Sequence, residues 1–461
     1  MTRLAAAVAV LAVVCGRADA RTWTVGGAAA DFPFIAPAIA AAVDGDTILV
    51  ARGVYRENLV VEKRLTIAGI GRPTLIGTGD GSVVTLVADG SEISGFAIEG
   101  SGRGETNEMD AAVQVRSNRN HVVDNVIRRV FYGVVVVDAR HNEIADNEIA
   151  GLRERPYGQR GDGIYVFRSP ENFIARNRIS GERDAIYFQY APRGRAVDNL
   201  VSDSRYGLHD MFSDDAVIAR NAFTGSAVGA NIMNSRRIRV ERNRVAGNRG
   251  VPGIGLTLKD CDESLVRDNR IVENARGLLL DGSSSNRFVD NLFESNDTAV
   301  TLFSSAERNR FGGNRFIDNR GDVVLSGRDS ATAWAIDGRG NYWSRYRGFD
   351  FDGDGVGDAP HPVVGAFERL EGANPAVRLF LQSPAAAGLE LAATMSGRTD
   401  ADAIDARPLV ASRVTASSQG NHAGQPDRLP LHVRVAGANL ACALVVIIAR
   451  MFRRGSGSCL R

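Results

Sequence analysis

Two consecutive segments of the chain read NLVSDSRYGLHDMFSDDAVIAR (residues 199–220) and NAFTGSAVGANIMNSRRIRVER (residues 221–242). Each is 22 residues long, opens on an asparagine and carries a short apolar strand after a small polar turn. Short strands separated by turns at a fixed period are typical of a solenoid and not of a sandwich. This pair of segments therefore predicts a chain built from repeated coils.

The same asparagine recurs along most of the chain. It stands at Asn125, Asn147, Asn177, Asn199, Asn221, Asn243, Asn269, Asn291 and Asn314, in steps of 22, 30, 22, 22, 22, 26, 22 and 23 residues. A period near 22 without helical spacing predicts an all-β fold, a right-handed parallel β-helix with one coil per repeat. Each coil then pairs with the next at about 4.8 Å. We expect this solenoid to span residues 21–345, with loops at the two longer steps, near 152–160 and 247–252.

The recurring asparagines have a structural explanation. Asparagine tolerates the left-handed conformation of a tight corner, and its amide can hydrogen-bond to the amides of the coils above and below. A second, partial ladder is expected five residues further on, at Asn248, Asn274, Asn296 and Asn319. We assign no chemistry to these side chains.

The start of the chain has two signatures of its own. Residues 1–20 are typical of a secretory signal peptide, with Arg3, an apolar run and a small-x-small cleavage site that ends at Ala20. Residues 34–43 predict a short helix that covers the open edge of the first coil.

The chain beyond the solenoid divides into three predicted parts. These are an acidic loop (346–362), a helical docking segment (363–412), and a polar linker with a short apolar tail (413–461). In the docking segment we expect a helix over 375–394, with Asn374 as its cap and Pro375 at its first position. The apolar run 435–449 is short for a membrane span, which favours a docked helix or a frayed tail over a membrane anchor.

Charge and composition exclude several classes of protein. The 461 residues carry 55 basic and 54 acidic side chains, a net charge of +1, which excludes a nucleic-acid binder held by a broad basic face. Lys63 and Lys259 are the only lysines. Neither stands in a phosphate-binding loop motif, so the chain is not itself a P-loop ATPase.

Alignment on the asparagines assigns the faces of the long strand in each coil. Residues thirteen and eleven positions before each asparagine are nearly all apolar and point inward, so those twelve and ten positions before it point outward. The outward positions place His209, Met211 and Met233 together on neighbouring coils. Two thioethers and an imidazole are soft ligands that suit monovalent copper. The alternative is a face that merely carries large side chains. Asp210 breaks the inward column, and a buried carboxylate needs a partner.

A second candidate metal site lies in the acidic loop, which reads DFDGDGVGD at residues 350–358. Asp350, Asp352, Asp354 and Asp358 resemble the start of a calcium-binding loop. The closing acid of an EF-hand would fall at His361, so the pattern is incomplete. A solvated acidic turn is the alternative.

Longer stretches carry a resemblance to a known family. YGLHDMFSDD (206–215), GNYWSRYRGFDFDGDGVGD (340–358) and DARPL (405–409) are similar to NosD, the periplasmic maturation protein of nitrous oxide reductase. The resemblance covers about residues 21–411, and the stretch after Arg413 departs from it. The repeat alone is not specific, because sugar lyases and epimerases share it.

The resemblance implies a non-catalytic periplasmic protein that is membrane-associated through a partner. NosD-like proteins act with the permease NosY and the ATPase NosF, an ABC-type assembly, to help build the copper-sulfur centre of nitrous oxide reductase. They are expected to receive copper from the chaperone NosL. The resemblance therefore favours copper at the outward face, although it supplies no list of ligands.

Two other classes of function remain open. A carbohydrate-active β-helix enzyme, a lyase or an epimerase, would need clustered acids, or an acid with histidine or arginine, on one outer face. His209, Asp214 and Asp215 meet that need in part, but the Asp-Pro-His signature of the epimerases is absent from the sequence. A purely structural or adhesive β-helix would show no distinctive outer column.

Overall fold

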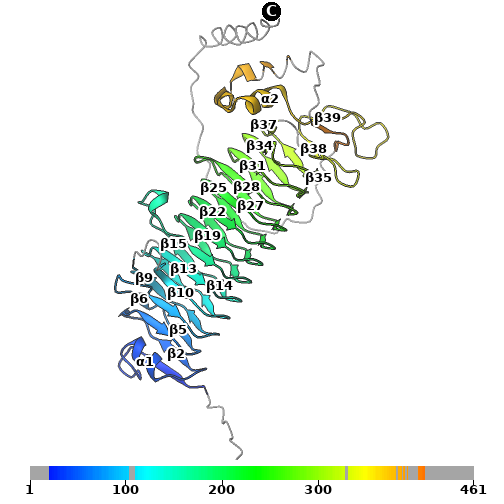
Figure 1. The fold of residues 1–461 in the computed structure, drawn as a ribbon. Helices are drawn as coiled ribbons and strands as arrows, with labels where there is room; N and C mark the ends of the chain where they lie inside the picture. The colour runs from blue at the N-terminus through cyan, green and yellow to red at the C-terminus, as the bar shows by residue number, and fades with distance from the viewer. Residues whose placement is uncertain are drawn as a thin grey trace, which may run out of the picture.

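The structure is a computed structural model, and it describes residues 20–102, 109–327, 331–380, 383–386, 388–389, 392 and 403–410. The chain winds into a rod of stacked coils, with α1 (Ile35–Ala41) at one end and α2 (Ala366–Ala373) at the other (Figure 1). Strands of successive coils pair in parallel along the whole rod. The predicted parallel β-helix is therefore confirmed.

Three sheets line the rod. The 13 strands of sheet 1 are β1 (Thr22–Val25), β2 (Thr47–Val50), β5 (Thr66–Gly69), β8 (Glu92–Ser94), β11 (His121–Val123), β14 (Glu143–Ala145), β17 (Phe173–Ala175), β20 (Arg195–Val197), β23 (Val217–Ala219), β26 (Arg239–Glu241), β29 (Leu265–Arg267), β32 (Arg287–Val289) and β35 (Arg310–Gly312). The 13 strands of sheet 2 are β3 (Val54–Arg56), β6 (Thr74–Ile76), β9 (Ala97–Glu99), β12 (Val126–Arg128), β15 (Glu148–Ala150), β18 (Arg178–Ser180), β21 (Leu200–Ser202), β24 (Ala222–Thr224), β27 (Arg244–Ala246), β30 (Arg270–Val272), β33 (Leu292–Glu294), β36 (Arg315–Ile317) and β38 (Tyr342–Trp343).

Sheet 3 contains the longest strands and the predicted metal face. Its 12 strands are β4 (Leu59–Val61), β7 (Val84–Leu86), β10 (Ala111–Val115), β13 (Tyr132–Val137), β16 (Ile164–Phe167), β19 (Asp184–Gln189), β22 (Tyr206–Met211), β25 (Val228–Met233), β28 (Ile254–Lys259), β31 (Arg276–Asp281), β34 (Thr298–Phe303) and β37 (Gly321–Ser326). Inward side chains such as Leu208, Leu256 and Leu278 are fully buried and pair in register from coil to coil. This alternation of faces holds the apolar core inside the rod.

The asparagine ladder is continuous from Asn125 to Asn341. At each step the side-chain oxygen of one asparagine accepts hydrogen bonds from the backbone N–H and the side-chain N–H of the asparagine one coil earlier, at 2.8–3.2 Å. The last rung ends on Asp405, whose carboxylate accepts a 2.7 Å hydrogen bond from the Asn341 backbone N–H. The ladder thus satisfies buried backbone groups that the turns leave unpaired.

One part of the explanation for the ladder was wrong. The left-handed conformation belongs to the residue before each asparagine, with φ of 59° at Asp198 and 56° at Arg220, and not to Asn199 or Asn221. The asparagines therefore recur because of the hydrogen bonds that their side chains make. Their own backbone dihedrals do not require asparagine.

Two shorter ladders run beside the main one. The predicted ladder from Asn248 through Asn274 and Asn296 to Asn319 is present, with contacts of 2.9–3.1 Å. A further ladder, not predicted, joins Asn120, Asn142 and Asn172 at 2.8–3.2 Å, and its column resumes with Asn286 and Asn309 at 3.0 Å. Its members stand five residues before asparagines of the main ladder, which is the spacing that would have revealed them.

The first coil is covered as expected. The helix predicted over 34–43 is α1, and β1, which was not predicted, adds a strand beyond β2. Glu57 accepts hydrogen bonds from the backbone N–H groups of the first turn of α1, at 2.8 and 3.0 Å. Lys63 donates to three carbonyls at its other end. Both ends of this short helix are therefore fixed by side chains from the solenoid.

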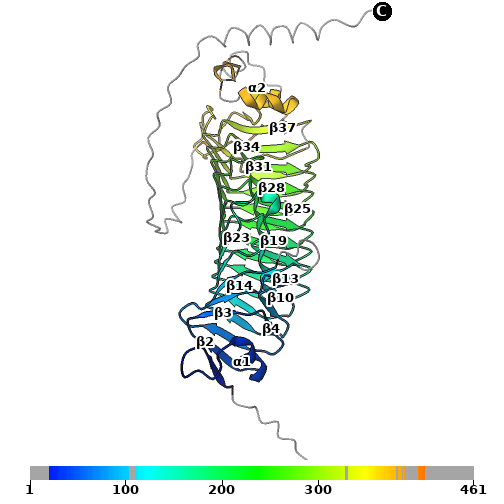
Figure 2. The same cartoon turned by 90° about the vertical axis from the view of Figure 1, so that its left-hand side faces the viewer.

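The last coil is closed by an aromatic side chain and a helix. Trp343 is buried and stacks on Phe316 with ring centroids 4.1 Å apart. Beyond it, α2 packs over β37 at the end of the rod (Figure 2). The short antiparallel pair of β39 (His361–Pro362) and β40 (Ile404–Asp405) holds the returning chain against this end.

The helix predicted over 375–394 begins at Pro375 as expected, although as a 3-10 helix, and residues 384–386, 388–389 and 392 further along are helical; α2 is an additional helix that was not predicted. The structure has α2 before Asn374 and a 3-10 helix, η2 (Pro375–Phe380), after it. Asn374 is extended (φ −144°, ψ 97°), as residues before proline usually are. Its side chain nevertheless caps the new turn, because Oδ1 accepts a 3.2 Å hydrogen bond from the Ala376 N–H.

Several predictions fall on parts of the chain outside the described residues. These are the signal peptide up to residue 19, most of 381–402 in the docking segment, and the linker and tail at 413–461 with the apolar run 435–449. In the described part of the chain, no helix has both the length and the apolar character that a membrane crossing needs.

Asp322, on β37, makes the stability of the closed end depend on pH. Burial raises the pKa of this carboxyl to about 6, although Arg345 and a hydrogen bond from Asn319 favour ionisation. Between about pH 4 and 6, the Asp322 carboxyl therefore keeps its proton in the native state but is ionised in the unfolded chain. The free energy of unfolding should therefore fall by roughly 2–3 kcal/mol as pH rises through that window.

The test of this pH dependence is urea denaturation of the wild-type protein and of Asp322→Asn at pH values from 4 to 7. The amide keeps the size of the carboxyl but carries no proton to lose, so the variant should lack this part of the fall. Equal slopes in the two proteins would show that Asp322 is ionised throughout.

Candidate metal centre

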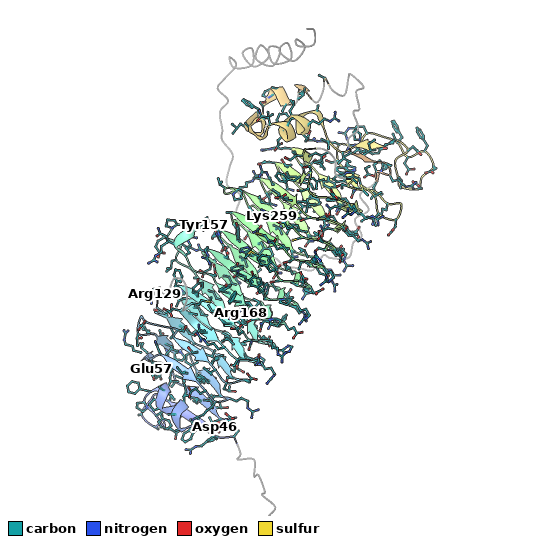
Figure 3. All side chains as sticks on the ribbon, in the orientation of Figure 1. Asp46, Glu57, Arg129, Tyr157, Arg168 and Lys259 are labelled. Atoms are coloured by element: carbon teal, nitrogen blue, oxygen red, sulfur yellow. The ribbon has the colours of Figure 1, made fainter. Side chains whose placement is uncertain are left out.

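The predicted outward face lies on sheet 3, at the corner where both insertions occur. The loop at 152–160 joins β15 to β16, and the loop at 247–252 joins β27 to β28, so both enter sheet 3 from the same corner. The first loop contains η1 (Tyr157–Gln159) and stands away from the rod, with Tyr157 at its labelled position in Figure 3. The two loops thus flank the coils that carry the candidate ligands.

An aromatic column covers the outer face of sheet 3 from β13 to β22. The rings of Tyr132, Tyr165, Tyr187 and His209 follow one another on successive coils, and the exposed fraction of each residue is 8% or less. These side chains are separate from the core inside the coils and pack on one another. The outward column is therefore a second, smaller cluster and not an open surface.

His209 is the last ring of this column and is held on three sides. Its ring stacks on Tyr187 with centroids 4.3 Å apart and an interplanar angle of 5°. Tyr206 meets it edge-on at 5.0 Å. Its Nδ1 lies 3.0 Å from Oδ2 of Asp184, a side chain with no exposed surface. The imidazole plane is thus fixed before any ligand binds.

The other ring nitrogen of His209 has no partner. Nε2 is out of contact with solvent and makes no hydrogen bond to any described residue. A buried polar atom without a partner is costly, so a free nitrogen on a ring whose other nitrogen is already bound points to a ligand. Because solvent does not reach Nε2, a metal ion can bind there only when a neighbouring side chain moves.

Met211 and Met233 lie beside His209 as the sequence predicts. They are direct register partners on β22 and β25, and both are half-buried. Asn231, the register partner of His209, donates a 3.2 Å hydrogen bond from Nδ2 to Sδ of Met233. Methionine is flexible and its sulfur is a soft ligand. Met211 thus packs against the aromatic cluster that holds His209, and Met233 is paired with it one coil further on.

Asp210 points into the core behind this face. One carboxylate oxygen accepts a 2.8 Å hydrogen bond from Oγ of Ser235, and the other has no partner among the described residues. Burial raises the pKa of Asp210 to about 8, against the effect of the Ser235 hydrogen bond. The side chain is therefore neutral at neutral pH, which is how the core accommodates it.

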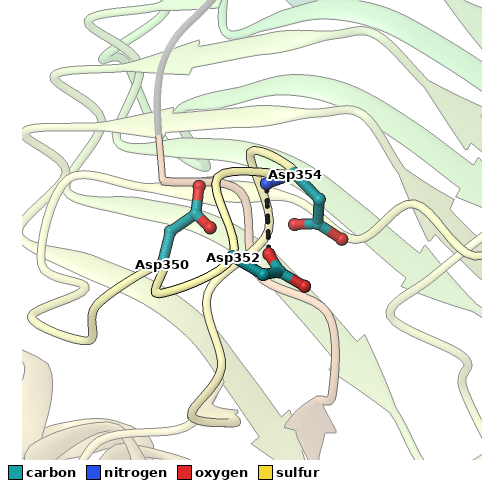
Figure 4. Close-up of side chains that lie close together, drawn as sticks. All are labelled: Asp350, Asp352 and Asp354. Atoms are coloured by element: carbon teal, nitrogen blue, oxygen red, sulfur yellow. Dashed lines mark hydrogen bonds between the residues drawn. The ribbon is translucent and has the colours of Figure 1, made fainter.

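The acidic loop gathers three of its four predicted carboxylates. Oxygens of Asp350, Asp352 and Asp354 lie within 4.8 Å of one another (Figure 4). Asp358 stands apart from them and accepts a 2.7 Å hydrogen bond from the Phe351 N–H. Each of the three gathered carboxylates also accepts a hydrogen bond from a backbone N–H of the loop. These bonds explain the loop without an ion, and calcium binding here stays a prediction.

Sequence reasoning missed the charged residues behind His209. Asp184 and Arg205 form an ion pair with contacts of 2.7 and 2.9 Å, and Asp184 is also the hydrogen-bond partner of the imidazole. The signal was a second aspartate, Asp162, which stands 22 residues before Asp184 and forms the same kind of pair with Arg183. Two aspartates separated by the 22-residue period of the coils indicate acidic side chains at equivalent positions of neighbouring coils.

Comparison with known proteins gives relatives over most of the chain. Residues 151–348, which include His209, Met211 and Met233, match the family model described as "Periplasmic copper-binding protein (NosD)". A Pseudomonas aeruginosa protein named "Probable ABC transporter binding protein NosD" is 30% identical over 351 residues, 72% of this chain and 81% of the relative. A protein of the same name from Stutzerimonas stutzeri is 26% identical over 352 residues, 72% of this chain and 79% of the relative.

A solved structure shares the fold. The complex of the alginate lyase AlyF-OU02 with G6 has a TM-score of 0.51 and 14% identity, covering 72% of this chain and 89% of that one. At this identity the likeness concerns the parallel β-helix alone.

Proposed function

The chain belongs to the NosD family, and from that premise we propose that it assists assembly of the copper-sulfur centre of nitrous oxide reductase in the periplasm. Copper is its cargo and not a resident cofactor. The protein performs no catalysis and takes copper from a NosL-type chaperone. It works together with a NosF-type ATPase and a NosY-type permease.

The observation that carries this proposal is the unpartnered Nε2 of His209 beside the paired methionines. An imidazole nitrogen and two thioether sulfurs form an uncharged, soft donor set, which suits monovalent copper better than hard divalent ions. We propose His209, Met211 and Met233 as the residues that hold copper in transit. Met211 and Met233 are half-buried, so they are the groups that an incoming copper ion meets first.

The ABC-type partners supply what the chain lacks. The sequence contains no phosphate-binding loop with a lysine, and the relatives are named ABC transporter binding proteins. We propose that the segment 363–412 docks on the permease. Its support is the apolar surface that it exposes, with Leu379 86% exposed and Leu370 and Phe380 exposed at 42% and 43%. Association with the membrane then follows from the permease.

The experiment that tests this function is deletion of the gene in a host that makes nitrous oxide reductase. We expect the reductase purified from the deletion strain to lack its copper-sulfur centre, as measured by copper content and by the optical spectrum of the enzyme. The intact gene should restore the centre, and a His209→Ala copy should not. Full loading of the reductase in the deletion strain would overturn the proposal.

A further inference from the structure

Two equivalent ion pairs lie on the outer face of sheet 3, one coil apart. Asp162 accepts hydrogen bonds from the guanidinium of Arg183 at 2.6 and 2.9 Å, and Asp184 accepts them from Arg205 at 2.7 and 2.9 Å. Both aspartate side chains have no exposed surface, while the two arginines are partly exposed. Such bidentate pairs fix the orientation of a carboxylate.

The second pair differs from the first in what else it touches. Oδ2 of Asp184 lies 3.0 Å from Nδ1 of His209. The residue that stands opposite His209 on the preceding coil is Tyr187, which offers no ring nitrogen. One ion pair is therefore linked to the candidate ligand, and the other is the same arrangement without that link.

The link determines where the imidazole carries its hydrogen. Asp184 accepts two hydrogen bonds from the Arg205 guanidinium, at 2.7 and 2.9 Å, and this bidentate pairing stabilises the ionised form of the carboxylate. An ionised carboxylate can only accept hydrogen bonds. Nδ1 must then be the donor, and in the neutral ring the free lone pair is on Nε2, the nitrogen that has no partner.

We propose that Asp184, held by Arg205, is a positioning residue that keeps the hydrogen of His209 on Nδ1 and presents Nε2 to a soft monovalent cation. The inference rests on the proposed copper function and adds the residues that prepare its ligand. Because Arg205 cancels the charge of Asp184, the donor set of one imidazole and two thioethers stays uncharged. A site without net charge favours a monovalent ion over a divalent one.

The first test reads the imidazole itself, with no metal present. In the full-length protein labelled with ¹⁵N-histidine, long-range ¹H–¹⁵N spectra distinguish a ring that carries hydrogen on Nδ1 from one that carries it on Nε2. We expect His209 with hydrogen on Nδ1 in the wild-type protein and a mixture of the two forms in Asp184→Ala. A wild-type ring with hydrogen on Nε2, or an unchanged spectrum in Asp184→Ala, would overturn the proposal.

The second test measures binding of Ag(I), a redox-inert probe for monovalent copper. Removing the partner of a ligating histidine typically costs about 10- to 100-fold in metal affinity, and we expect a loss of that size in Asp184→Ala. The matched control is Asp162→Asn, which removes the charge of the equivalent buried ion pair one coil earlier and keeps an oxygen for the 3.1 Å hydrogen bond that Asp162 accepts from the Asp184 backbone N–H. It should leave Ag(I) affinity within about threefold of the wild type, since it leaves the bond to His209 in place.

The outcomes separate this inference from the proposed function. Equal Ag(I) affinity in Asp184→Ala and the wild type would reject the positioning role and leave the copper function standing. A wild-type protein that fails to bind Ag(I), although its spectrum shows the Asp184-dependent hydrogen on Nδ1, would instead reject the copper site. If Asp184→Ala does not fold, Asp184→Asn makes the same comparison, because its amide must point N–H groups at Arg205 or at His209.

Discussion

Replacing Met211 and Met233 together by alanine is expected to weaken copper(I) binding by more than about 100-fold, because loss of a ligand's supporting hydrogen bond alone costs about 10- to 100-fold. The two thioethers are register partners, and Met211 packs against the aromatic cluster that holds His209. Their removal leaves a single imidazole as donor. One imidazole without soft neighbours binds monovalent copper poorly. The measurement is a competition titration of the purified protein against a coloured copper(I) chelator.

The control for this double variant is Met109→Ala. Met109 packs against the same aromatic cluster, so its loss perturbs the outer face without touching the proposed ligands. We expect its copper(I) affinity to match that of the wild type. If the double variant and Met109→Ala both bind as tightly as the wild type, the methionines are packing residues and copper binds elsewhere.

The coil and its faces could be predicted from the sequence because they depend on spacing. Asparagines at a step of 22 residues, with apolar residues at fixed distances before them, define which side chains point inward. The spacing alone therefore places Met211 next to Met233, and their pairing in register confirms it. The pattern is visible in the sequence because each coil makes the same contacts with its neighbours.

The partners of His209 could not be predicted in the same way. Asp184 is 25 residues away and reaches the imidazole from the preceding coil. It stands at the start of β19, where period two would point it inward with Ile186, yet its carboxylate reaches the outward-facing His209. The alternation of inward and outward side chains along a strand therefore does not predict which face Asp184 occupies.

The ends of the rod were harder still to predict from the sequence, because they lie outside the repeat. The return of Asp405 to the last rung of the ladder joins residues that are 64 positions apart. Sequence indicated a proline-started helix at Pro375 but not that α2 would end shortly before it. Such contacts are made only once, by one segment of the chain, so they produce no repeating pattern in the sequence.

Asn221→Ala should lower the free energy of unfolding by roughly 3–5 kcal/mol, the range in which breaking a buried hydrogen-bond network falls. Nδ2 of Asn221 donates to the Ala196 carbonyl at 2.8 Å and to Asn243 at 3.0 Å. Its oxygen accepts from the backbone and side chain of Asn199. Alanine removes all four bonds and leaves their buried partners unpaired, which costs more than the bonds themselves contributed.

The neighbouring variant Arg220→Ala compares the buried ladder with the surface ion pair at the same corner. Arg220 has positive φ at the same corner, and its exposed side chain pairs with Asp198 on the surface. A surface ion pair contributes about 0–1 kcal/mol, and alanine suffers the left-handed backbone about as much as arginine does. Urea denaturation should therefore shift strongly for Asn221→Ala and little for Arg220→Ala. Equal shifts would mean that the buried amide ladder contributes no more to the stability of the coil than the surface ion pair of Arg220 with Asp198 does.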